Sequence, residues 1–185
     1  MNTPAKRPGN EHRLLVHALT VADVSPLPML VQRIADSGCN LADARVSTLA
    51  ADCSVALLAE GPWDAIAKLE GVLERLSSDR ELHLCWYRTQ FRNPQLNLLP
   101  YLVEVVSADK PGILAAIVNF FSHRHISIEQ MVSMRYQAMQ TGAAMFSAQI
   151  TIGVPADSHI AALRDEFLEL CDGLNLDAIL DPMKF

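Results

Sequence analysis

The segment Asp109-Lys110-Pro111-Gly112-Ile113-Leu114 has the residue types best suited to binding chemistry. Gly112 carries no side chain, so a ligand can approach the backbone there closely. Pro111 fixes φ near −65° and suits the first turn of a helix. The first N–H groups of a helix have no intrahelical partner and lie at the positive end of its dipole. The segment therefore predicts a site for a small carboxylate.

Asp109 has two possible roles in that segment. Its carboxylate could cap the helix that follows, or it could meet the ammonium group of an amino acid. A plain strand-to-helix turn, capped by Asp109 and binding nothing, is the alternative that the residues leave open.

Other residues with catalytic or metal-binding potential lack suitable neighbours. His123 and His125 have no third histidine or cysteine nearby, which favours surface histidines or a helix-terminal cap over a metal site. Ser133, Ser147 and Cys53 have no general base at a diagnostic spacing. No glycine-rich nucleotide loop is present. We therefore expect no enzyme activity, no metal and no cofactor.

The cysteines indicate a reducing compartment. Cys39, Cys53, Cys85 and Cys171 are widely spaced and form no C-x-x-C pair, so free thiols are expected. The N-terminus lacks the apolar run of a signal peptide, and no stretch approaches the roughly 20 apolar residues of a membrane span. These features favour the cytoplasm.

The elements that must position the turn occur twice, about 87 residues apart. Leu15-Val16-His17-Ala18-Leu19 corresponds to Leu102-Val103-Glu104-Val105-Val106, and the apolar positions of the following helix correspond as well. The first copy has Ala22-Asp23-Val24-Ser25 at the turn and lacks both Pro and Gly. The repeat predicts two duplicated domains with unequal binding sites.

Each copy is predicted to have the same order of elements. In the first, strands are expected at 13–20, 40–48, 54–59 and 81–87, with helices from Pro26 or Pro28 to about Gly38 and after Gly61-Pro62. In the second, strands are expected at 101–107, 127–136, 143–154 and 174–180, with helices at 111–123 and 158–170. We expect the methionines of this copy to pack between sheet and helix: Met131, Met134, Met139 and Met145.

This β-α-β-β-α-β order predicts an α+β fold of two ferredoxin-like domains, each with an antiparallel sheet and both helices on one face. The predicted division is a flexible tail at 1–11, a domain at 12–88, a linker at 89–100 and a domain at 101–185. A unit this small buries a modest core and leaves sheet edges unpaired. Module pairing, and a homodimer or other homo-oligomer, is therefore expected.

The charge balance argues against direct contact with nucleic acid. The chain of 185 residues has a net charge of −6, and its basic residues form no stripe. Lys6, Arg7 and Arg13 lie near the N-terminus, where a solvated tail is the simpler interpretation. We expect no binding to duplex DNA by the chain alone.

The signature Asp109-Lys110-Pro111-Gly112-Ile113-Leu114 within a β-α-β-β-α-β unit resembles the ACT domain, a small regulatory module that often binds amino acids. Two such units in tandem, without a catalytic or DNA-binding domain, resemble the glycine cleavage system transcriptional repressor family. The segments Gly38-Cys39-Asn40-Leu41 and Gly61-Pro62-Trp63-Asp64-Ala65-Ile66 add to this resemblance, which spans residues 12–181.

The resemblance implies that a ligand lies between paired modules, against the turn and the start of the second strand. It assigns ligand-binding roles to Asp109, Lys110, Pro111, Gly112, Ile113 and Leu114, and to the second-strand positions Asn40 and Ser127. Ser127 replaces the usual Asn of the family. A composite site would combine the turn of one module with Asn40 of another.

The function that follows is regulation without catalysis. The resemblance implies a sensor of a small amino acid, such as glycine, that represses the glycine cleavage genes through a protein partner such as a DNA-binding activator. The alternative is a regulatory subunit or stand-alone regulatory module of an enzyme of amino-acid metabolism. An autonomous enzyme is the weakest reading of the residues.

Overall fold

The computed structural model describes residues 11–21, 23, 25–78, 82–90 and 97–183. The chain divides into two compact units, Met1–Asn93 and Pro94–Phe185. Each described unit is an antiparallel four-stranded sheet with two helices, so the α+β fold of tandem ferredoxin-like domains is confirmed. Residues 1–10 of the expected tail at 1–11, residues 91–96 of the expected linker at 89–100, and Ala22 and Val24 of the first turn lie outside the described residues.

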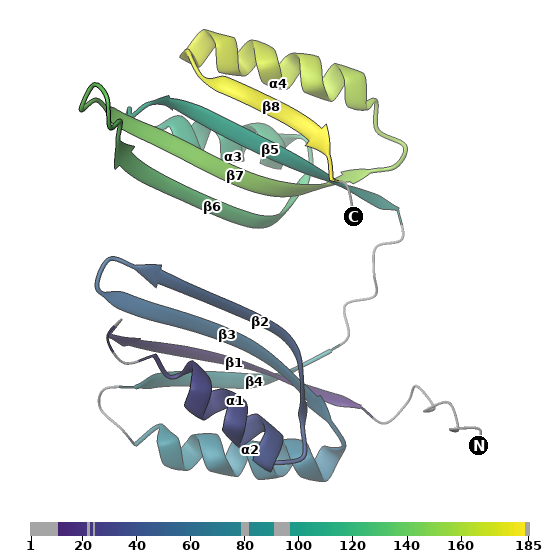
Figure 1. Ribbon diagram of the computed structural model, residues 1–185. Helices are drawn as coiled ribbons and strands as arrows, with labels where there is room; N and C mark the ends of the chain where they lie inside the picture. The colour runs from purple at the N-terminus through teal and green to yellow at the C-terminus, as the bar shows by residue number, and fades with distance from the viewer. Residues whose placement is uncertain (1–10, 22, 24, 79–81, 91–96, 184–185) are drawn as a thin grey trace, which may run out of the picture. The chain divides into compact units, whose positions relative to one another are not determined.

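The first unit follows the expected order of elements (Figure 1). Its elements are β1 (His12–Val21), α1 (Leu27–Asp36), β2 (Asn40–Leu49), β3 (Asp52–Gly61), α2 (Trp63–Leu76) and β4 (His83–Thr89). The sheet order is β2-β3-β1-β4, with every neighbouring pair antiparallel.

The second unit repeats this arrangement. Its elements are β5 (Leu98–Ala108), α3 (Ile113–His123), β6 (Ser127–Gln137), β7 (Ala144–Pro155), α4 (Ile160–Leu174) and β8 (Asp177–Pro182). The sheet order is β6-β7-β5-β8. β5 begins at Leu98, earlier than the expected 101, and α4 extends beyond 170 to Leu174.

Both cores lie between one face of the sheet and the two helices (Figure 1). On the central strands β1, β3 and β7, alternate residues are buried against the helices, as a sheet covered on one side requires. In the second unit the ring of Phe167 lies 5.4 Å from Phe120 and 5.1 Å from Phe121, centroid to centroid. These aromatic contacts join α3 to α4 at the middle of the helical layer.

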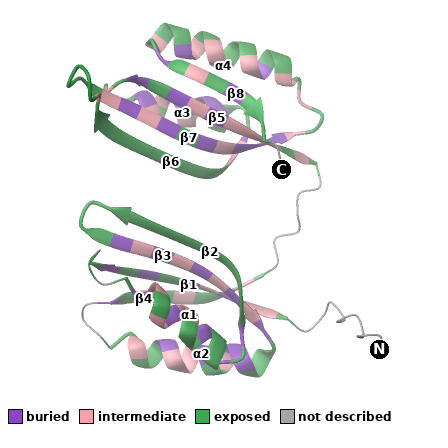
Figure 2. Cartoon of the chain, in the orientation of Figure 1, coloured by how far each residue is buried: buried purple, intermediate pink, exposed green. Residues whose placement is uncertain are grey.

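The strands β2 and β6 occupy sheet edges, and their side chains are largely exposed (Figure 2). All ten residues of β2 are exposed. Leu41, Ala44 and Val46 lie on one side of the strand, because a bulge between Leu41 and Asp43 changes the alternation of the side chains. That face is not buried, because the helices cover the central strands rather than this edge.

The expectation that four methionines pack between sheet and helix was wrong for three of them. Met131 is 41%, Met134 57% and Met139 103% exposed, while Met145 is half-buried. Met131 and Met134 belong to the edge strand β6, and Met139 follows it in the turn before β7. Sequence alone did not show that this segment would be the sheet edge.

Candidate functional site

The turn between β5 and α3 is held by backbone contacts and by one left-handed residue. The N–H of Asp109 donates to the carbonyl of Ala144 on β7 at 2.9 Å, which fixes the end of β5. Gly112 has φ +91°, a left-handed conformation that side chains disfavour. The helix therefore begins at Ile113, and its first described backbone bond runs from Ala116 N–H to the Gly112 carbonyl at 3.0 Å.

Two expectations about this turn need correction. Pro111 was expected in the first helical turn, but it lies in the preceding turn, because left-handed Gly112 stands between it and the helix. Asp109 was considered as a cap, but no side chain of the described residues caps the start of α3. The Asp109 carboxylate instead pairs with Arg135 of β6, with Oδ2 and Nη2 2.5 Å apart.

A cavity of about 440 Å³ opens beside this turn. Its walls come from the turn, from the start of α3 and from the strands β6 and β7. Among the predicted site residues, those that line it are Asp109, Lys110, Gly112, Ile113 and Leu114. It is further lined by Ala115, Ser133, Met134, Arg135 and Phe146.

The cavity brings both signs of charge to an uncapped helix start. Asp109 contributes a carboxylate whose side chain is only 16% exposed, and Lys110 and Arg135 contribute cations. The first N–H groups of α3 have no partner within the helix and receive no side-chain cap from the described residues. A ligand with a carboxylate and an ammonium group matches this set of charges and donors.

The remaining predicted site residues lie elsewhere. Ser127 begins β6 and donates its hydroxyl hydrogen to Glu129 Oε1 at 2.7 Å, away from the cavity lining. Asn40 begins β2 of the first unit and is exposed. Pro111 does not line the cavity.

A glycine opposite Ser127 explains the local packing. A Cβ placed on Gly153 would approach Ser127 Oγ to 2.7 Å and Leu98 Cδ1 to 2.9 Å. The two residues face each other across β6 and β7 in the sheet register. The side chain of Ser127 therefore packs between these two strands.

Arg135 is the charged cavity residue that the sequence interpretation missed. It faces Phe146 across the β6–β7 ladder, on the helix side of the sheet. The hairpin turn after residue 137 sets this register, so aligning the two expected strands through that turn would have indicated which side Arg135 takes. Ser133 shares the same face, because side chains two residues apart on a strand point the same way.

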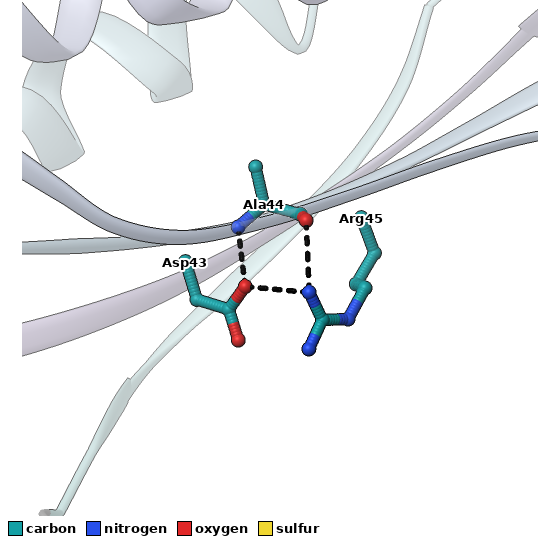
Figure 3. A network of polar contacts seen from close by, with 3 residues as sticks. All are labelled: Asp43, Ala44 and Arg45. Carbon is teal, nitrogen blue, oxygen red and sulfur yellow. Dashed lines mark hydrogen bonds and ion pairs between the residues drawn. The ribbon is translucent and has the colours of Figure 1, made fainter. Parts of the chain in front are cut away.

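The exposed ion pair of Asp43 and Arg45 in the first unit differs from the pair of Asp109 and Arg135 (Figure 3). Asp43 accepts a bond from the backbone N–H of Ala44 at 2.7 Å and from Arg45 Nη1 at 2.8 Å. All three residues are consecutive on the edge strand β2. This local network joins no two elements, whereas Asp109 and Arg135 connect the turn to β6.

Two buried cysteine thiols carry no charge near neutral pH. Burial raises the pKa of the Cys171 thiol to about 11, and burial likewise raises the pKa of the Cys39 thiol. Both are therefore neutral near pH 7. All four cysteines have free thiols, and Cys85 is the exposed one.

No group of three or more potential metal ligands occurs among the described residues. None of the helices in the described ranges combines the length and the apolar character needed to cross a bilayer.

Comparison of the sequence with known proteins identifies one matching domain family and similar proteins of nearly the same length. The ACT domain family model matches residues 26–86, which lie in the first unit rather than in the unit with the signature turn. The glycine cleavage system transcriptional repressor of Escherichia coli K12 is 26% identical over 176 residues, covering 95% of this chain and 93% of that protein.

Solved structures share the fold over the same length. A crystallised candidate glycine cleavage system transcriptional repressor is 22% identical, with a TM-score of 0.68, covering 95% of this chain and 99% of that one. A protein of unknown function from Galdieria sulphuraria is 13% identical, with a TM-score of 0.76, covering 94% of this chain and 99% of that one. The first unit thus matches the ACT domain, and the chain is similar over nearly its whole length to glycine cleavage system transcriptional repressors.

Proposed function

We propose that this chain is a non-enzymatic regulator that binds a small amino acid beside the turn at Asp109–Gly112. The observation that carries the proposal is the cavity of about 440 Å³ that joins an uncapped helix start to Asp109, Lys110 and Arg135. In this arrangement Lys110, Arg135 and the N–H groups of Ile113 and Leu114 receive the carboxylate. Asp109 receives the ammonium group.

A small side chain suits the apolar part of the cavity. Leu114, Met134 and Phe146 line it together with the charged groups. Glycine and other small amino acids fill such a space without displacing these side chains. The name of the E. coli relative supports glycine metabolism as the context.

Module pairing along the exposed edges would complete the site. β6 contributes Ser133, Met134 and Arg135 to the cavity, and its outer edge has no partner strand in the described chain. A second module added along this edge would stand beside the cavity and could bring Asn40 or Ser127 toward it. The expected domains at 12–88 and 101–185 would supply the pairing modules, either within one chain or between two copies.

The regulatory output is proposed to pass through a protein. The net charge of −6 opposes binding to the phosphate backbone. A partner such as a DNA-binding activator would therefore carry the effect to the glycine cleavage genes, in the cytoplasm. The purified chain alone should give no mobility shift with duplex DNA at physiological salt, and a salt-sensitive shift at sub-micromolar protein would contradict this.

Calorimetric titration with glycine, alanine and serine tests the binding step. Gly112→Val should abolish binding, because a β-branched side chain obstructs the helix start. Gly142→Val is the matched control, since Gly142 also has a left-handed φ, of +67°, and open space around it but does not line the cavity. Ser25→Val, at the turn of the first unit, should bind like the unmodified chain. Equal loss in all three variants, or no binding by the unmodified chain, would refute the site.

A further inference from the structure

A second concave surface lies on the helical layer of the second unit, between the C-terminal halves of α3 and α4. It has a volume of about 530 Å³, and it shares no lining residue with the cavity at the turn. We propose that this groove docks an amphipathic helix of a partner protein, and that the polar face of this helix is basic. The inference deepens the proposed function, on which it rests, by assigning the surface through which the partner is engaged.

The spacing of the lining residues on α4 is that of one helical face. Glu166, Glu169, Leu170, Gly173 and Leu174 follow the i, i+3, i+4, i+7, i+8 pattern. Gly173 is exposed, and a Cβ built on it would meet nothing within 4 Å. The missing side chain leaves the groove open between the two half-buried leucines, where an apolar side chain of a docked helix can enter.

Arg124 forms a fixed wall on the α3 side. Its guanidinium lies 3.7 Å from the centre of the Phe120 ring and donates to the Phe120 carbonyl at 3.2 Å. Its Nε and Nη2 also donate to Glu166 Oε2 at 2.9 and 2.6 Å. These contacts hold the wall in place and neutralise the charge of Glu166.

The border of the groove is acidic. Asp165, Glu169 and Asp172 follow the i, i+4, i+7 spacing on the exposed side of α4, and they make no ion pair within the described part of the chain. The one basic residue of α4, Arg164, is engaged with the Leu180 carbonyl at 2.9 Å and with Asp181 at 3.6 Å. A basic helix matches this border, because its cations would face three uncompensated carboxylates.

A second copy of the chain fits the groove less well. Among the described helices, α1 has one basic and one acidic residue, α2 has an acidic excess, and α3 has no Lys or Arg. None could present a basic face to α4. The occupant is therefore a different protein.

The test uses the full chain and a synthetic labelled peptide of about five helical turns, with leucines at i, i+3 and i+4 spacing and lysines elsewhere. A counterpart with glutamates in place of the lysines controls for hydrophobic adhesion. In fluorescence anisotropy the lysine peptide should bind and the glutamate peptide should not. Neutralising the border in Asp165→Asn, Glu169→Gln, Asp172→Asn should weaken binding and reduce its salt dependence.

Gly173→Leu supplies the decisive variant. Leucine has a higher helix propensity than glycine, so the fold is retained. Its side chain fills the groove, so binding of the lysine peptide should weaken about tenfold or more. Gly71→Leu on α2 is the matched control, since a Cβ there meets only the end of Arg75 at 3.9 Å. It should bind the peptide like the unmodified chain.

Three outcomes would overturn the proposal: equal binding of both peptides, unchanged binding by Gly173→Leu, or a loss of self-association in Gly173→Leu that shows a second copy as the occupant. Glycine titration of the same variants separates this proposal from the proposed function. Gly173→Leu should keep its amino-acid affinity. If the chain binds the lysine peptide but no amino acid, only the amino-acid site is refuted. If it binds an amino acid but not the lysine peptide, only the docking groove is refuted.

Discussion

Replacing Arg135 with methionine should weaken amino-acid binding while leaving the fold stable. The side chain of Arg135 is 75% exposed, so its pair with Asp109 contributes little to folding in the absence of ligand. A hydrogen bond to a charged group contributes about 1.5–3 kcal/mol. Because Arg135 is largely solvated and already engaged by Asp109, the lower value applies, and about 1.5 kcal/mol corresponds to roughly a tenfold loss of affinity.

Calorimetry with glycine measures this loss, and thermal unfolding checks that the variant is folded. Arg45→Met is the matched control, because Arg45 is 65% exposed and pairs with Asp43 on the edge strand of the other unit. It should bind like the unmodified chain. Undiminished affinity in Arg135→Met, or an equal loss in Arg45→Met, would refute the assignment of Arg135 to the carboxylate.

Further predictions concern stability, pH and thiol chemistry. Phe167→Ala should destabilise the second unit by about 3–5 kcal/mol in urea unfolding, because the ring is fully buried; a loss below about 1 kcal/mol would contradict the packing. The hydrogen bonds from Arg88 lower the pKa of Glu70, so that pair stabilises the fold above about pH 4.5 and loses its effect as pH falls through the lowered value. Glu70→Gln should therefore be less stable than the unmodified chain at pH 7 and equally stable at strongly acid pH, and a difference that persists in acid would contradict the linkage. A thiol reagent at pH 8 should label Cys85 rapidly and Cys171 only on unfolding, and rapid labelling of both would refute the burial of Cys171.

The order of strands and helices was predictable because periodicity and turn residues act locally. Leu30 and Ile34 on α1, and Ile66, Leu69 and Leu73 on α2, are buried at the spacing that the sequence indicates. The duplicated pattern was equally visible, and its correspondence extends to the bulges, since the register shifts after Leu41 in β2 and after Ile128 in β6.

Features that depend on distant partners were not predictable in the same way. Asp109 was predicted either to cap the helix or to meet an ammonium group, and its ion pair with Arg135 exists because β6 passes beside the turn. Phe120 is buried against Phe167 of α4, a contact that the local pattern of the first helix of this unit does not reveal. Met134 was expected to be covered, and its exposure follows from the edge position of β6.

Titration of the isotopically labelled chain with glycine, followed through its backbone amide resonances, shows whether an amino acid binds in the cavity beside the turn. The resonances that shift are expected to cluster at Asp109, Gly112 and Leu114 on the turn and at Ser133 and Arg135 on β6. Absence of any shift at millimolar glycine, or shifts confined to residues outside the cavity, would contradict binding there.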